Sequence, residues 1–163
     1  MSLRDRLWQP SRKHQGGRLR VGFCDVNWNV VKYSPWLDNI IPFGGRYFTL
    51  DRLIDRPETA GGLKYIALGY GTLLPSTSDV KLQDEYVRKG IPEAGKNRSA
   101  EEVSLTAFFP AYDCAYLINR VGVFGGAAAT ETKDSGTLFA HLKPTIDNSS
   151  GEWNLSMEYV FDL

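Results

Sequence analysis

The sequence predicts an all-β protein: an antiparallel β-sandwich or barrel that carries a long, extended N-terminal arm and one short helix. Segments of strand length recur at intervals of roughly ten residues along the second half of the chain. The 163 residues include 16 glycines and 8 prolines, which favour turns and strands over long helices. Several segments alternate apolar and polar residues, the pattern of a half-buried antiparallel strand. These three observations disfavour an all-α protein and favour a sandwich or barrel.

The length of the chain corresponds to one domain, which we divide after residue 62. Residues 1–62 are expected to form an extended N-terminal arm and oligomerisation segment, and residues 63–163 a β-sandwich body. The apolar fraction of 42% and the charged fraction of 23% are those of a soluble protein. No apolar stretch approaches the roughly 20 residues of a membrane helix, and the first residues lack the apolar centre of a signal peptide. We therefore expect a soluble protein made in the cytoplasm, without a membrane partner.

Charge is distributed unevenly although the net charge is zero. Residues 1–62 hold ten Lys and Arg against six Asp and Glu, whereas residues 63–163 hold nine against thirteen. A basic start suits an acidic protein surface or a nucleic-acid backbone, or is simply solvated and disordered. Nothing in the body matches a zinc finger, a recognition helix or the paired aromatic motif of an RNA-binding sheet, which argues against nucleic acid. The arm residues expected to contact a partner are Trp8, Arg12 and Arg18.

Residues 1–18 show no sustained period and contain helix-breaking Pro and Gly residues, so they are expected to form an arm. Two short strands, Leu19–Cys24 and Asn27–Tyr33, follow around a turn at Asp25 and are expected to pair as a hairpin.

Residues 34–57 are apolar but repeatedly interrupted by Pro and Gly. Such a segment does not bury itself as a helix or a long strand, so it is expected to lie along another surface. A neighbouring subunit is one such surface, and the body of its own domain is the other. The first alternative predicts a homo-oligomer, and its contact residues would be Trp36, Ile40, Ile41, Phe43, Tyr47 and Phe48.

The segment that follows carries the turn expected to define the fold. A strand over residues 63–68 leads into Gly69 and Gly71, which allow the backbone to turn, and then into a loop that begins at Pro75. The loop ends at Asp79, a natural N-cap, which predicts one or two helical turns within residues 80–86, with Val87 leading toward the next strand. A nucleotide-binding loop is excluded because the glycine spacing is wrong and no Lys-Ser or Lys-Thr pair follows.

The remaining strands are predicted from alternation over residues 102–109, 112–118, 120–124, 136–142 and 152–163. The last of these is the clearest, because five large apolar side chains share one face: Trp153, Leu155, Met157, Tyr159 and Phe161. It reaches the last residues, so the end of the chain is expected to lie inside a sheet.

We find no catalytic or metal-binding constellation in the sequence. The two histidines, His14 and His141, are far apart, and His141 is expected to be a satisfied strand residue. Cys24 and Cys114 are too few for a disulfide framework and too far apart for a metal knuckle, so both are expected to be buried free thiols. We therefore predict no catalytic residue, no cofactor, no metal and no enzymatic activity.

The body carries an ordered set of motifs: the run from Tyr65 to Thr72, then Pro75, Asp79, Leu82, Glu85 and Arg88, then the runs Val121–Gly126 and Gly136–Ala140, and last the terminal aromatic strand. The order of these motifs, over about residues 63–163, resembles a widespread family of tailed-bacteriophage virion proteins. Members of this family are capsid decoration (cement) proteins with a β-tulip-like fold, or tail, baseplate and fibre proteins. Tyr70 and the pair His141 and Leu142 depart from the family pattern.

The resemblance implies a non-enzymatic structural protein of the virion, assembled in the host bacterial cytoplasm. A long N-terminal arm is what a decoration protein uses to embrace a neighbour, so we expect a homotrimer that binds the major capsid protein on the capsid exterior and stabilises the shell. A tail, baseplate or fibre protein is the alternative. A carbohydrate-binding or receptor-binding module is another, because Trp28, Trp36 and Tyr112 are aromatic residues expected at the surface.

Overall fold

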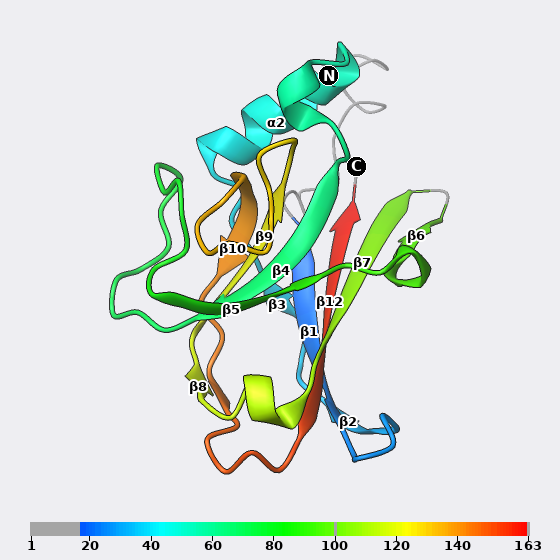
Figure 1. The fold of residues 1–163 in the computed structure, drawn as a ribbon, viewed down its shortest axis with the longest axis vertical. Helices are drawn as coiled ribbons and strands as arrows, with labels where there is room; N and C mark the ends of the chain where they lie inside the picture. The colour runs from blue at the N-terminus through cyan, green and yellow to red at the C-terminus, as the bar shows by residue number, and fades with distance from the viewer. Residues whose placement is uncertain (1–16, 100, 163) are drawn as a thin grey trace, which may run out of the picture.

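The described residues form a mostly β fold, with antiparallel sheets and one α-helix among them, as expected for the class (Figure 1). We describe a computed structural model, in which residues 17–99 and 101–162 are described. The larger sheet contains, in spatial order, β2 (Val30–Tyr33), β1 (Arg18–Cys24), β12 (Asn154–Asp162), β7 (Glu102–Phe109) and β6 (Lys96–Arg98), and β3 (Leu37–Asp38) also pairs with β1.

The second sheet has four strands in the order β10 (Thr137–Leu142), β9 (Arg120–Gly125), β4 (Leu63–Gly69) and β5 (Glu85–Gly90). A small third sheet pairs β11 (Ile146–Asp147) with β8 (Leu117–Ile118). The helix α2 (Phe43–Leu53) lies at one end of the molecule and packs on β10 (Figure 1). Three short 3-10 turns complete the structure: η1 (Pro57–Thr59), η2 (Glu93–Gly95) and η3 (Ala111–Asp113).

The core lies between the two larger sheets, to which both contribute fully buried apolar side chains. Val21 of β1 and Met157 of β12 belong to the same packed cluster as Ile66 of β4 and Val123 of β9. The hydroxyl of Tyr159 crosses between the sheets and donates to the carbonyl oxygen of Val121 at 3.1 Å. Since apolar burial contributes about 25 cal/mol per Å² of buried surface, this shared interior holds the two sheets together.

Several predicted strands are confirmed, because alternation is recorded locally in the sequence. The strand expected over residues 152–163 forms β12, which pairs along its length with β1 and β7. Strands β7 and β10 also form within the ranges predicted for them, and β4 and β9 each extend one residue beyond theirs. The hairpin of β1 and β2 is confirmed, and its turn is closed by the Asp25 carboxylate, which accepts the N–H groups of Asn27 and Asn29 at 2.8 and 3.0 Å.

The predicted division after residue 62 requires a correction. Strand β1 pairs with β12 from Arg18 to Cys24 and buries Leu19 and Val21 completely, so residues 18–24 are part of the body. This pairing joins residues more than a hundred positions apart in the sequence, so it could not be predicted from the local pattern of residues. The rest of the predicted arm, including Trp8 and Arg12, lies outside the described residues.

The predicted position of the helix is wrong. Residues 85–90 form strand β5, and the Asp79 carboxylate accepts the N–H of Ser76 at 2.7 Å, which closes a turn where an N-cap was expected. The helix forms instead at residues 43–53, within the segment that we expected to be irregular. Residues 112–118 also differ from the expected strand, because they form most of η3, an irregular stretch and the two-residue β8.

Close packing explains why a segment with two adjacent glycines is helical. A Cβ atom at Gly45 would overlap the carbonyl oxygen of Phe139 in β10. Glycine therefore lets α2 approach the sheet edge at backbone distance, which outweighs the roughly 1 kcal/mol that a glycine costs in a helix relative to alanine. Pro42 precedes the helix in an extended conformation, the position at which proline is tolerated.

Candidate functional site

The outward face of α2 carries a row of exposed apolar side chains. Phe43, Tyr47, Leu50 and Ile54 follow one another at steps of four, three and four residues, so they share one side of the helix. With Leu53 they are between 48% and 79% exposed. We call these five residues the α2 face.

The opposite side of α2 packs on its own domain. Phe48 is buried, and its ring meets the ring of Phe139 edge-on at a centroid distance of 5.8 Å. Phe139 in turn packs edge-on against Phe161 of β12, at 5.2 Å. This contact accounts for the inner side of α2, which lies at one end of the molecule (Figure 1), whereas the residues of the α2 face are exposed. Contiguous exposed apolar surface of this kind is typical of an interaction site.

The structure separates the contact residues predicted within residues 34–57 into different environments. Phe43 and Tyr47 lie on the α2 face, whereas Phe48 and Ile41 pack inward. The inward packing agrees with the second alternative, in which this segment lies on the body of its own domain. Ile40 is half-buried and its backbone pairs with that of His141.

Trp36 and Arg18 meet beside strand β1 of the larger sheet. The guanidinium carbons of Arg18 and Arg20 lie 4.6 and 4.8 Å from the Trp36 ring centroid. Both arginines are also paired with carboxylates, Arg18 with Glu102 at 3.3 Å and Arg20 with Glu158 at 2.6 Å. Because these cations already have anionic partners, the cluster stabilises β1 and leaves little unbalanced charge for a ligand.

Gly69 and Gly71, the two turn glycines, do not have positive φ angles. Their function is therefore to let neighbouring groups pack close to the backbone. The backbone N–H of Gly71 donates to the side-chain oxygen of Asn119 at 2.7 Å, and the Asn119 amide donates back to the Gly71 carbonyl at 2.8 Å. A Cβ atom at Gly69 or Gly71 would collide with the backbone or side chain around Gln83. Both glycines therefore let the segment after β4 pack tightly against the residues that precede β5.

Pro75 and Asp79 belong to the loop that follows, which covers a cavity of about 440 Å³. Its lining comes from the loop, the segment before β5, and strands β9 and β10: Leu73, Leu74, Ser76, Asp79, Lys81, Gln83, Arg120 and His141. We call this cavity the Arg120 pocket. Ligand pockets commonly have volumes of about 300–1,000 Å³.

His141 and Arg120 are both buried in the wall of this pocket. The His141 Nε2 lies 3.2 Å from the Ser76 carbonyl oxygen and 3.7 Å from an Asp79 carboxylate oxygen. Burial lowers the pKa of His141 below its ordinary value, and the contacts with Ser76 and Asp79 oppose that shift only in part. Desolvation also lowers the pKa of Arg120, which stays a cation at neutral pH.

The described residues contain no grouping of three or more His, Cys, Asp or Glu that could hold a metal ion. Cys24 and Cys114 are free and buried, as predicted. Burial raises the pKa of Cys114 to about 11, although hydrogen bonding from Asn148 opposes the shift. Its sulfur contacts backbone oxygens and Asn148, which is the environment of a structural thiol and not of a nucleophile. No helix of the described residues has the length and apolarity needed to cross a membrane.

Sequence reasoning overlooked two features of these sites. The spacing of Phe43, Tyr47, Leu50 and Ile54 was a readable helical signal, but the neighbouring glycines and prolines outweighed it. The Arg120 pocket had no such signal, because its residues come from three separate parts of the chain. Compared with known proteins, the chain matches no protein-family model, no curated protein sequence and no solved structure.

Proposed function

We propose that this chain is a non-enzymatic structural subunit of a tailed-bacteriophage particle and that it assembles with copies of itself through the α2 face. The observation that carries the proposal is the exposed apolar stripe of Phe43, Tyr47, Leu50 and Ile54 on a helix whose other side is already packed. Full burial of one such side chain contributes about 1.5–3 kcal/mol. The five residues of the α2 face together therefore offer several kcal/mol to a subunit contact.

A second copy of the chain is the occupant that we propose for this face. Most oligomers of soluble proteins are homo-oligomers, and in a cyclic trimer each subunit contacts its two neighbours through two different surfaces, so the three α2 faces would meet around the three-fold axis. The homotrimer expected from the sequence is the oligomer we propose. Interfaces of standard size bury about 800 Å² on each partner, so the strands beside α2 would add to the contact.

The virion setting is supported by the resemblance described above. Its motifs fall on strands β4, β5, β9, β10 and β12 and on the loop between β4 and β5, which together make up much of the body. On this basis we propose a β-tulip-like fold and a capsid decoration role, in which the oligomer binds the major capsid protein and bridges capsomers. A protein that binds only the assembled shell stabilises it by mass action.

A tail, baseplate or fibre role is the second candidate, and one observation favours it. The decoration role was inferred from a long arm, but residues 18–62 contribute β1, β2, β3 and α2 to the body. Residues 18–62 therefore do not form the extended arm on which the decoration role was based.

Sedimentation equilibrium of the purified chain tests the assembly. We expect a trimer at micromolar concentration, and Leu50→Glu should dissociate it because the variant places a charge in the contact. The matched control is Val26→Glu, since Val26 is 84% exposed in the turn between β1 and β2. A wild-type monomer, or equal dissociation by both variants, would refute assembly through the α2 face.

Immunogold electron microscopy tests the position in the particle. Antibodies raised against the purified chain are applied to particles released from bacteria that carry its gene. Label on the capsid surface supports the decoration role, and label on the tail or baseplate supports the second candidate. Particles without label, in a lysate that contains the chain, contradict both.

A further inference from the structure

Arg120 carries a buried charge that the described residues do not neutralise. The residue is 2% exposed and lies at the start of β9. Its Nη1 donates to the Asn119 carbonyl at 2.9 Å and its Nη2 to the Gln83 side-chain oxygen at 3.2 Å, and both acceptors are uncharged. Within the described structure no carboxylate forms an ion pair with Arg120. The carboxylate of Asp79 interacts with it electrostatically, but from farther away than the distance of an ion pair. Buried cations are normally paired with an anion, because desolvation of an isolated charge is costly.

Arg88, which is also a buried arginine, has an anionic partner. Arg88 makes two hydrogen bonds with the carboxylate of Glu85, at 2.6 and 2.9 Å, and three more with Thr130 and Ser135. Arg120 makes two bonds to neutral groups. A guanidinium has five N–H donors, so three on Arg120 have no acceptor among the described residues.

The surroundings of Arg120 combine positive charge with apolar surface. Lys81 is exposed on the same pocket and forms no ion pair within the described structure, so with Arg120 it outweighs the single carboxylate of Asp79. Leu73 and Leu74 are 68% and 79% exposed at the margin. The loop that closes the pocket is held in place, since the Phe43 N–H donates to the Thr77 carbonyl at 2.8 Å.

We propose that the Arg120 pocket binds a carboxylate group attached to an apolar body. The carboxylate would take the free donors of Arg120, as planar guanidinium and carboxylate groups match in geometry. The apolar body would lie against Leu73 and Leu74. An acidic side chain of a partner polypeptide next to an apolar residue has this chemistry, and so does a small free carboxylic acid with a branched aliphatic chain.

Amide and side-chain N–H shifts of the full-length chain, measured by two-dimensional NMR, test the proposal. The probes are 4-methylpentanoate, acetate, 4-methylpentanamide, inorganic phosphate and the blocked peptide acetyl-Leu-Glu-Leu-amide. Binding of 4-methylpentanoate should shift the signals of residues 73–83, Arg120 and His141, and its affinity should exceed those of acetate and of the uncharged amide. Equal affinity for the amide, stronger binding of phosphate, or shifts spread evenly over the surface would overturn the proposal.

Substitutions connect the binding to the named residues. Arg120→Gln should weaken 4-methylpentanoate binding by about tenfold or more, the loss expected for a charge-assisted hydrogen bond. If that variant does not fold, variants at the exposed residues Lys81 and Leu74 provide the test. Lys81→Gln should weaken the binding of both 4-methylpentanoate and acetate, and Leu74→Ser should weaken the binding of 4-methylpentanoate more than that of acetate.

The matched control is Arg98→Gln, which removes an exposed arginine of β6 and should change nothing. A loss in the control equal to that in Lys81→Gln would reduce the effect to general charge and refute the pocket. The blocked peptide and the free acid distinguish the two sources: tighter binding of the peptide indicates a polypeptide partner, and tighter binding of the free acid indicates a small molecule.

Discussion

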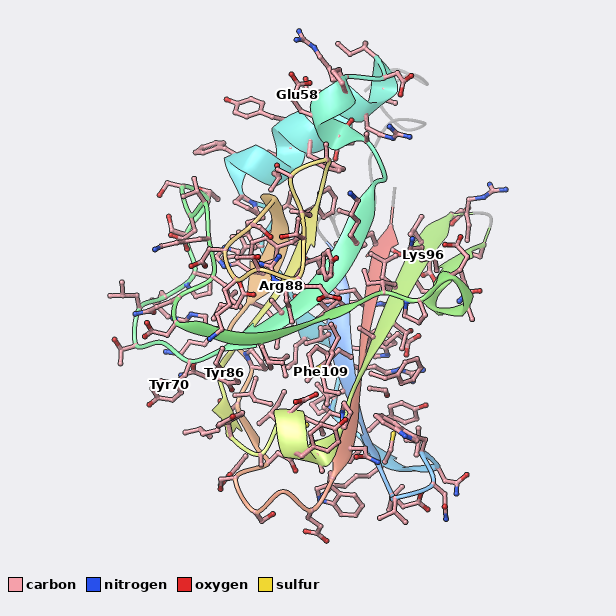
Figure 2. All side chains as sticks on the ribbon, in the orientation of Figure 1. Glu58, Tyr70, Tyr86, Arg88, Lys96 and Phe109 are labelled. Atoms are coloured by element: carbon pink, nitrogen blue, oxygen red, sulfur yellow. The ribbon has the colours of Figure 1, made fainter. Side chains whose placement is uncertain are left out.

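The ion pair of Glu85 and Arg88 is expected to fasten the loop between β9 and β10 onto the four-stranded sheet, and its removal should be strongly destabilising. The two side chains are 0% and 2% exposed. Glu85 also accepts the N–H of Asp134 at 3.0 Å, and Arg88 donates to the carbonyl oxygens of Thr130 and Ser135 at 3.0 Å. Figure 2 shows Arg88 in the middle of the molecule, where β5 and this loop lie together.

Glu85→Gln retains the shape of the side chain but removes its charge, so the guanidinium of Arg88 stays buried without an anion. Breaking a buried pair in this way typically costs about 3–5 kcal/mol in the free energy of unfolding. Some of that loss should be recovered in the double variant Glu85→Gln with Arg88→Met, which removes the buried cation and puts an apolar side chain beside the Phe124 ring, over which the guanidinium carbon of Arg88 lies at 4.4 Å. The double variant should therefore be more stable than the sum of the two single effects predicts.

Urea denaturation at pH 7, followed by tryptophan fluorescence, measures these differences. The matched control is Lys96→Gln, because Lys96 pairs with Glu93 at the surface, where Glu93 is 92% exposed, and such pairs contribute about 0–1 kcal/mol. Amide hydrogen exchange at residues 130–135 should accelerate in Glu85→Gln and not in the control. If Glu85→Gln costs no more than Lys96→Gln, or if the two single effects are additive, the pair does not hold the loop as we argue.

Three further predictions follow from buried polar groups. Tyr159→Phe should lower the free energy of unfolding by about 0.5–1.5 kcal/mol, because it removes a buried hydrogen bond between the two sheets, from the Tyr159 hydroxyl to the Val121 carbonyl. An unchanged urea midpoint would contradict this. Thiol titration without reductant should detect both cysteines only after denaturation, because both are free and buried. In the native chain Cys114 should be alkylated slowly at pH 8, because its pKa is raised to about 11. Rapid alkylation of the native chain would contradict the burial of Cys114. Because the pKa of His141 is lowered in the folded chain, the imidazole of the unfolded chain is protonated first as the pH falls through the ordinary value near 6.5. The free energy of unfolding should therefore decrease from pH 7.5 to pH 5.5, and His141→Gln should show a smaller decrease between those two pH values.

The sequence by itself determined the strands whose alternation is complete. Leu155, Met157, Tyr159 and Phe161 repeat at every second position, and a strand buried on that face satisfies all four at once. The hairpin of β1 and β2 was equally readable, since Asp25 supplies the hydrogen bonds of its turn within five residues. Such patterns act over short distances along the chain, so they can be recognised without knowing what they pack against.

Tertiary structure decided between conflicting local signals for the helix, and it alone brought the residues of the Arg120 pocket together. Gly45 disfavours a helix locally, and only the Phe139 carbonyl beneath it shows why glycine stands there. The same packing turns Phe48 inward and leaves Tyr47 outside, so the α2 face exists because β10 occupies the other side of the helix. Arg120 lies 37 residues from Gln83, and its charge became informative only once the fold had buried it beside neutral groups. Burial and charge balance depend on contacts between distant segments, and these are properties that a linear pattern does not carry.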